Sequence, residues 1–142
     1  MIRIGTIEEA YEIFLNVPEL DAYLSLQKMK ERLADRDYLV AVAEHDGVLI
    51  GFKIGYKISD DEFYSWLGGV IPIHRQFGVA QTLLDFQESW VRNAGLKYIS
   101  VKSMNRFPSM LRLLIKNGYK IKNIKFFDDP DNERIEFIKT LN

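Results

Sequence analysis

The stretch that decides the fold is "GVIPIHRQFGVAQTLL", residues 69–84. An apolar run ends at Pro72, a short turn carries Arg75 and Gly78, and a helix-like apolar pattern begins at once. A strand that passes through such a turn into a helix places the helix N-terminus, with its unpaired N–H groups, beyond the end of the strand. Two interpretations are open here: an ordinary strand-to-helix connection, or a cradle for a phosphorylated ligand.

Alternating and helical apolar patterns predict the elements on either side. Thr6 and Glu9 form a capping-box pattern, and Asp46-Gly47 supplies a hairpin turn. Pro108 suits the first turn of a helix, and Gly118 closes it. We expect strands over 2–4, 38–44, 48–59, 63–70, 98–103, 119–127 and 133–141, and helices over 6–17, 21–34, 78–93 and 108–117.

The expected order is β-α-α-β-β-β-α-β-α-β-β, which is an α/β class with a mixed central sheet. The first strands form an antiparallel meander. The connection through the helix at 78–93 makes strands 63–70 and 98–103 parallel neighbours. At 142 residues, without an internal repeat or linker, residues 1–142 are expected to form a single domain.

Composition excludes several classes of function. Nineteen basic and twenty acidic residues leave a net charge of −1, which gives no electrostatic case for nucleic acid or for a membrane surface. Because there is no cysteine, neither a disulfide framework nor a thiolate metal site is expected, and no metal is assigned. Without a signal-like or membrane-spanning stretch, we expect a cytoplasmic protein.

The cradle interpretation rests on backbone amides. Gly78 would allow a ligand to approach the backbone, and Arg75 would add a cation nearby. The amides that would converge on one anion are those of Gln76, Phe77, Gly78, Val79 and Ala80. On spacing alone, a turn glycine and a surface arginine explain the same residues equally well.

The pair Gly68-Gly69 shifts the balance toward a binding site. Two glycines at the end of a buried strand often mark a bulge or a close approach. A bulge there would push strand 63–70 away from strand 98–103 and expose backbone groups of residues 68–71. The other interpretation is that the glycines let the following helix pack closely.

At this point the sequence resembles the GNAT superfamily of acyl-CoA N-acyltransferases. "RQFGVA", residues 75–80, is similar to the family pattern Arg/Gln-x-x-Gly-x-Gly/Ala, which follows a strand and opens a helix. "SMNRFPSMLRLLIKNGY", residues 103–119, resembles a second family element, an Asn after the next strand and a helix that ends in Lys-x-Gly-Phe/Tyr. The order of elements matches over essentially the whole chain.

The resemblance implies acetyl-CoA as cofactor and a GNAT-like fold. The pyrophosphate would lie on the amides of residues 76–80, near Arg75. The pantetheine arm would pair with the backbone of Gly69, Val70 and Ile71 in the gap between the two parallel strands. Asn105 would contact the arm or an ordered water; a turn or helix-cap role is the alternative for this residue.

The implied reaction is acetyl transfer to a primary amine of a small molecule or protein, with the catalytic residues unassigned. Many family members carry a carboxylate on the strand equivalent to 63–70 and a Tyr where this chain has Leu114; neither is present here. Direct transfer is therefore expected, and the alternative is a non-catalytic acyl-CoA binding or regulatory domain. Glu19, Asp21 and Tyr23 would favour a cationic amine.

Aromatic residues near the C-terminus suggest a second interaction. The pairs Phe126-Phe127 and Phe137-Ile138 lie on the last two expected strands and would cover a sheet edge. A homodimer is therefore a further expectation.

Overall fold

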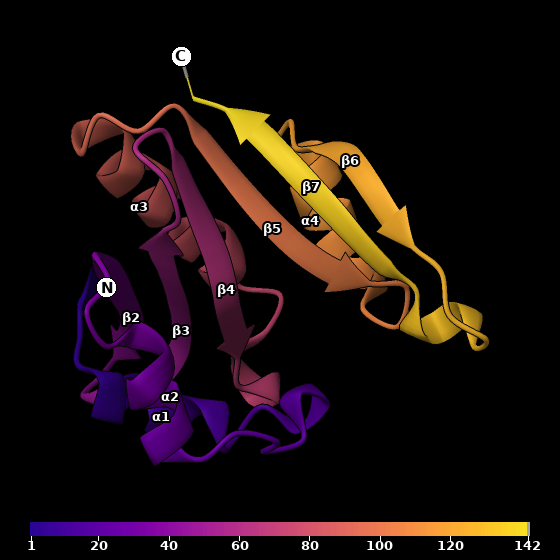
Figure 1. Ribbon diagram of the computed structural model, residues 1–142. Coiled ribbons are helices and arrows are strands. Elements are labelled where there is room, and N and C mark those ends of the chain that lie inside the picture. Colours follow the sequence, from indigo (N-terminus) through magenta and orange to yellow (C-terminus); the bar gives the residue numbers. More distant parts are fainter. Residues whose placement is uncertain (142) are drawn as a thin grey trace.

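The computed structural model describes residues 1–141 and has the expected α/β architecture, with the expected order of elements. Seven strands form one mixed sheet in the order β1-β2-β3-β4-β5-β7-β6 (Figure 1). The strands are β1 (Ile2–Ile4), β2 (Tyr38–His45), β3 (Val48–Lys57), β4 (Glu62–Val70), β5 (Tyr98–Met104), β6 (Lys120–Lys125) and β7 (Arg134–Thr140). The α-helices are α1 (Ile7–Phe14), α2 (Leu26–Leu33), α3 (Val79–Asn93) and α4 (Pro108–Lys116), with short 3₁₀ turns η1 (Pro18–Leu20), η2 (Pro72–His74) and η3 (Pro130–Asn132).

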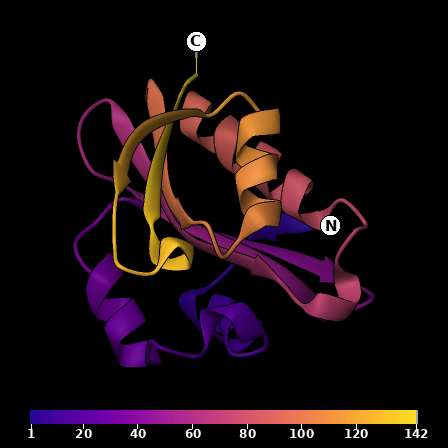
Figure 2. The same cartoon turned by 90° about the vertical axis from the view of Figure 1, so that its right-hand side faces the viewer.

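The helices cover the sheet in two layers (Figure 2). On one face, α1 and α2 pack over β2, β3 and β4 around the buried side chains of Phe14, Met29 and Phe52. On the other face, α3 and α4 pack over the centre of the sheet around Leu84 and Phe137. Within residues 1–141, no helix is long and apolar enough to cross a membrane.

Local signals account for most element boundaries. Asp46 and Gly47 both have positive φ, 50° and 79°, as the predicted hairpin requires. The second helix was predicted from residue 21, and this boundary is wrong. The structure begins α2 at Leu26, because Asp21 is left-handed and the Ser25 side chain caps the helix by accepting from the Lys28 amide.

The central feature of the sheet is a short parallel seam between β4 and β5. Only four residue pairs join the two strands, from Glu62↔Tyr98 to Ser65↔Val101. Beyond them β4 continues against β3, and β5 continues against β7. Figure 1 shows the two strands diverging from this seam. The predicted separation is confirmed: among residues 1–141, no strand pairs with residues 66–70 of β4 on that side.

The bulge in β4 lies earlier than the sequence suggested. Ile54 pairs with Leu67 and Gly55 pairs with Ser65, so Trp66 is the additional residue. Gly68 and Gly69 are in regular register with Lys53 and Phe52. Gly69 instead allows close packing on the α1 side, because a Cβ there would lie 3.0 Å from the methyl carbons of Val17.

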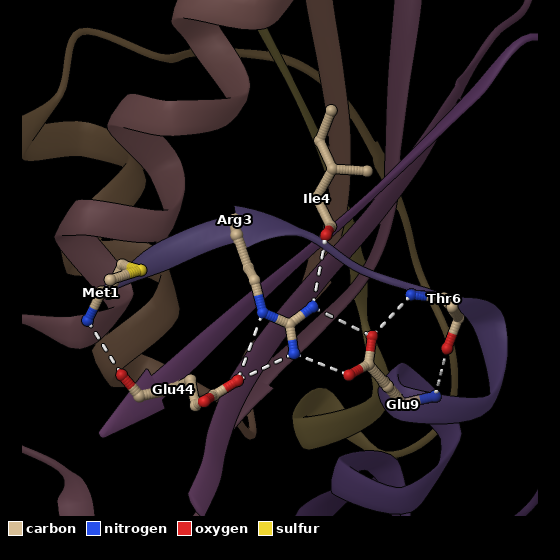
Figure 3. A network of polar contacts seen from close by, with 6 residues as sticks. All are labelled: Met1, Arg3, Ile4, Thr6, Glu9 and Glu44. Carbon is tan, nitrogen blue, oxygen red and sulfur yellow. Dashed lines mark hydrogen bonds and ion pairs between the residues drawn. The ribbon is translucent and has the colours of Figure 1, made fainter. Parts of the chain in front are cut away.

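A polar network fastens the first strand to the sheet (Figure 3). Arg3 bridges Glu9 of α1 at 2.7 Å and Glu44 of β2 at 2.8 Å. Glu9 also completes the capping box by accepting from the Thr6 amide. The Arg3 guanidinium and this amide lower the pKa of Glu9 to about 2. The predicted capping box is confirmed, and its glutamate also joins α1 to the sheet edge.

One of the aromatic residues predicted for the dimer surface is not on the surface. Phe137 is fully buried in the core of its own chain, so it cannot cover the edge of a partner. Phe126 and Phe127 are exposed just after β6, the edge strand. The exposed lysines of β6 discourage further strand pairing. The homodimer stays a prediction.

We expect Gly55→Ala to destabilise the protein by at least about 2 kcal/mol, because overpacking a rigid core costs this much. A Cβ at Gly55 would lie 2.2 Å from Cε2 of Phe63 and 2.7 Å from the Tyr64 carbonyl oxygen. At Gly51 the nearest atoms are the ends of the Leu83 and Val79 side chains at 3.2 Å, so Gly51→Ala is the milder control. Urea unfolding measures both, and equal losses would contradict this explanation.

Candidate functional site

The turn between β4 and α3 presents a run of free backbone amides. Gln76 and Gly78 are both left-handed, with φ of 69° and 79°. Within residues 1–141, the amides of Gln76, Phe77 and Gly78 donate no backbone hydrogen bond. Those of Val79 and Ala80 belong to the first turn of α3 and have no partner inside the helix. Free amides at a helix N-terminus are the groups that the predicted anion cradle requires.

The positions of the side chains suit this interpretation. A Cβ at Gly78 would meet no atom within 4 Å, so the space above this residue is open. Phe77 is 79% exposed, and Ala80 is exposed beside it. Val79 turns the other way, toward Gly51 on β3. Residues 76–80 thus present free backbone amides beside open space, with the exposed Phe77 side chain next to them; the cradle at these residues stays a prediction.

Arg75 does not point freely at the cradle. Its Nε donates to the Val70 carbonyl at 2.9 Å, and its Nη2 donates to the Glu19 carboxylate at 2.8 Å. The ion pair lowers the pKa of Glu19, and the carboxylate raises the pKa of Arg75. Arg75 thus joins the η1 segment to the end of β4 and positions the turn. Because its guanidinium is paired with Glu19, the positive charge predicted to bind phosphate already has a partner.

The free edge of β4 offers alternate backbone groups to the gap. The Ile71 amide donates a hydrogen bond to the Ile50 carbonyl of β3 at 2.9 Å, so this amide is not available to the predicted ligand. Backbone groups alternate in direction along an antiparallel strand, so the amide of Gly69 also points toward β3. The amides of Val70 and Gly68 therefore face the gap. A surface depression of about 390 Å³ lies elsewhere, at the end of the seam where β4 and β5 are paired. It is lined by Arg36, Tyr38 and Trp90, among others.

Asn105 lies at the other side of the gap, just after β5. Its Nδ2 donates to the Pro130 carbonyl at 3.0 Å, which holds the η3 turn between β6 and β7. It does not cap α4, because the residue at that position is Phe107. The side chain is exposed, and its role beside the gap stays a prediction.

Lys53 is a charged residue that the sequence analysis did not single out. It lies in the middle of β3 and is only 6% exposed. Its Nζ lies 3.6 Å from where a Cβ of Gly68 would be, so the ammonium rests on the strand that borders the gap. Burial lowers its pKa to about 8, against the charge of Glu88. The available signal was a single lysine inside the apolar run "GFKIGY".

Within residues 1–141, neither the carboxylate on strand 63–70 nor the tyrosine that the resemblance implies is present at its position. Leu114, at the position where many members have Tyr, is fully buried in the core. Tyr119 is buried and donates to Glu88 at 2.8 Å, and burial beside that carboxylate raises its pKa far above the usual range. Glu88 also binds Lys139 at 2.9 Å. These residues form a structural polar cluster under α3.

A family model described as "Acetyltransferase (GNAT) family" matches residues 5–119. The match covers β4, the turn with the free amides, α3 and α4. The chain belongs to the GNAT family of acetyltransferases. A search of curated protein sequences finds no match.

Solved structures share the fold at low sequence identity. The ribosomal-protein-S18-alanine N-acetyltransferase from Escherichia coli is 17% identical, with a TM-score of 0.85 over 99% of this chain and 93% of that one. The aminoglycoside 6'-N-acetyltransferase from Enterococcus faecium is 15% identical, with a TM-score of 0.81 over 100% and 97%. A GNAT acetyltransferase from Elizabethkingia anophelis, solved with acetyl-CoA bound, is 16% identical, with a TM-score of 0.79 over 99% and 97%.

We expect Lys53→Met to stabilise the protein at pH 7 by about 3 kcal/mol, the cost of a pKa lowered by burial from 10.5 to about 8. Below pH 8 the lysine is charged in both the folded and unfolded states, so the full cost applies. Between pH 8 and 10.5 only the unfolded state keeps the proton, so the wild type gains stability as pH rises and the difference shrinks.

Urea unfolding of both proteins from pH 7 to pH 10 measures this difference. Lys57→Met, on the same strand but at its less buried end, is the control and should show no such convergence. A difference between wild type and Lys53→Met that does not change with pH would contradict the effect of burial.

Proposed function

We propose that residues 1–142 act as one acetyl-CoA-dependent N-acetyltransferase domain that transfers an acetyl group to a primary amine of a small molecule or protein. The observation that carries the proposal is the run of five free amides at the N-terminus of α3, next to the unpaired edge of β4. One anion site beside one row of peptide-like donors suits a ligand with a pyrophosphate and an amide-containing arm. Membership of the acetyltransferase family supports the same ligand.

The residues divide the binding between them. The amides of residues 76–80 would hold the phosphates, and those of Gly68 and Val70 would hold the arm. Of the cofactor contacts predicted from sequence, Gly69 and Ile71 would contribute through the shape of the strand, since their amides face β3. Arg75 would position the turn, and Asn105 would border the arm from β5.

Acetyl-CoA, when bound, supplies a thioester that an amine can attack. The gap-facing amides of β4 are fixed donors that can stabilise negative charge on a carbonyl oxygen. Lys53 holds a proton on Nζ beside Gly68, and a pKa of about 8 lets it release that proton to a basic leaving group. We propose Lys53 for the role that Leu114 cannot perform.

We expect Gly78→Glu to abolish measurable CoA binding, because the side chain would place a carboxylate where the phosphates belong. Gly95 at the opposite end of α3 is the matched control, since it has φ of 83° and equally open space. Both substitutions carry the same left-handed strain of about 1–2 kcal/mol. Calorimetric titration with CoA measures the affinity, and similar weakening in both variants would argue against a cradle at residues 76–80.

The activity itself is tested by thiol release from acetyl-CoA across a panel of amines. We expect amine-dependent release by the wild type, and kcat about 100-fold lower in Lys53→Met with CoA affinity retained. Lys57→Met is the control and should keep wild-type kcat. Tight CoA binding without release for any amine would identify a non-catalytic acyl-CoA binding domain, the alternative raised by the missing carboxylate and tyrosine.

A further inference from the structure

Three cationic side chains surround the gap on the face covered by α1 and α2. They are Arg32 of α2, Lys102 of β5 and Arg134 of β7, and we call them the cationic cluster. The Arg32 guanidinium carbon lies 4.7 Å from the ring centroid of Trp66, the bulged residue of β4. The Lys102 Nζ lies 5.5 Å from the ring centroid of Tyr64, two residues earlier on the same strand. Cations on aromatic faces are attracted without being neutralised.

Arg32 is held in this position by a second contact. Its Nε donates to the Tyr56 hydroxyl at 2.9 Å, and Tyr56 is only 3% exposed. The contact uses one edge of the guanidinium and fixes its plane over Trp66. A guanidinium held in this way is preorganised for a carboxylate or phosphate.

The cationic cluster has no carboxylate partner inside the chain. Within residues 1–141, Arg32, Lys102 and Arg134 form no ion pair, whereas Arg3, Arg75 and Arg92 each bind a glutamate. The carboxylate nearest in register is Glu136, directly opposite Lys102 across β5 and β7.

Two tyrosines, Tyr23 and Tyr64, are affected by the charges of the same two arginines. Burial raises the pKa of Tyr23 and of Tyr64, and the charged groups that act on both are Arg32 and Arg134, which oppose the rise. The strand register places Arg134 on this face: it pairs with Met104, which lies two residues beyond Lys102 and on the same face of β5. Glu19, which the sequence suggested for a cationic amine, is bound to Arg75 instead.

We propose that the acceptor is an amine that also carries an anionic oxygen group, a carboxylate or a phosphate, which Arg32 and Arg134 bind. The inference rests on the proposed acetyltransferase function and names its substrate class. The cationic cluster would also reduce the need for a general base to deprotonate the amine. Nearby cations lower the pKa of a bound amine, so more of it is neutral and able to attack.

The test compares matched amines: β-alanine with propylamine, phosphoethanolamine with ethanolamine, and a peptide with an acidic second residue with its lysine counterpart. The first two pairs represent small acceptors, and the third represents a protein N-terminus. We expect the anionic member to have the lower KM in at least one pair. Arg134→Gln should raise that KM at least about 10-fold, as expected for a charge-assisted contact, and leave the neutral member unchanged.

Arg112→Gln on α4 is the matched control, because this exposed arginine donates a hydrogen bond to Ser109 of its own helix and forms no ion pair within residues 1–141. Binding of the same amines to the CoA-saturated protein, followed by ligand-observed NMR, gives a readout that does not need turnover. Anionic amines that bind through Arg134 without being acetylated would overturn the proposed function and leave only an anion-binding site at the cationic cluster. A preference for neutral or cationic amines, or a KM and affinity insensitive to Arg134→Gln, would overturn the inference.

Discussion

Everything at the site depends on the shortness of the β4–β5 seam. Four parallel pairs join strands that then continue against different neighbours, β3 on one side and β7 on the other. Each half of the sheet keeps its own antiparallel partner, and a cluster that contains Phe63 of β4 and Ile99 of β5 continues across the seam where the strands are paired. The cost of the separation falls on the backbone of β4 beyond Ser65, whose outward amides lack a strand partner. A ligand with peptide-like groups recovers those hydrogen bonds.

The site also accumulates groups that do not favour folding. Burial of Lys53 opposes the stability of the fold. The five free amides and the cationic cluster add no stabilising hydrogen bond or ion pair within residues 1–141. Elsewhere the chain satisfies such groups, as in the Arg3–Glu9–Glu44 network and the Tyr119–Glu88–Lys139 cluster. The contrast supports a functional interpretation of the unsatisfied groups, because binding a ligand would supply their missing partners.

The sequence predicted the order of elements and the turn that opens α3, since both depend on local chemistry. A capping box, a hairpin with two left-handed residues, and a glycine at a helix start are signals within a few residues. The errors concern relations between distant residues. The bulge was placed at Gly68-Gly69 because glycine permits one, whereas register against β3 put it at Trp66. Phe137 was assigned to a surface because alternation alone does not say which face α4 will cover.

The sequence by itself determined that a strand ends at Pro72 and that a helix opens after Gly78 with its amides free, because φ preferences and helix ends are properties of the local chain. Only the tertiary structure decided which partner each charge receives. Arg75 meets Glu19 across 56 positions, while Arg32 and Arg134 meet no carboxylate within residues 1–141 and act on the same two tyrosines. Coulomb interactions depend on distance in space, and spacing along a chain does not record that distance.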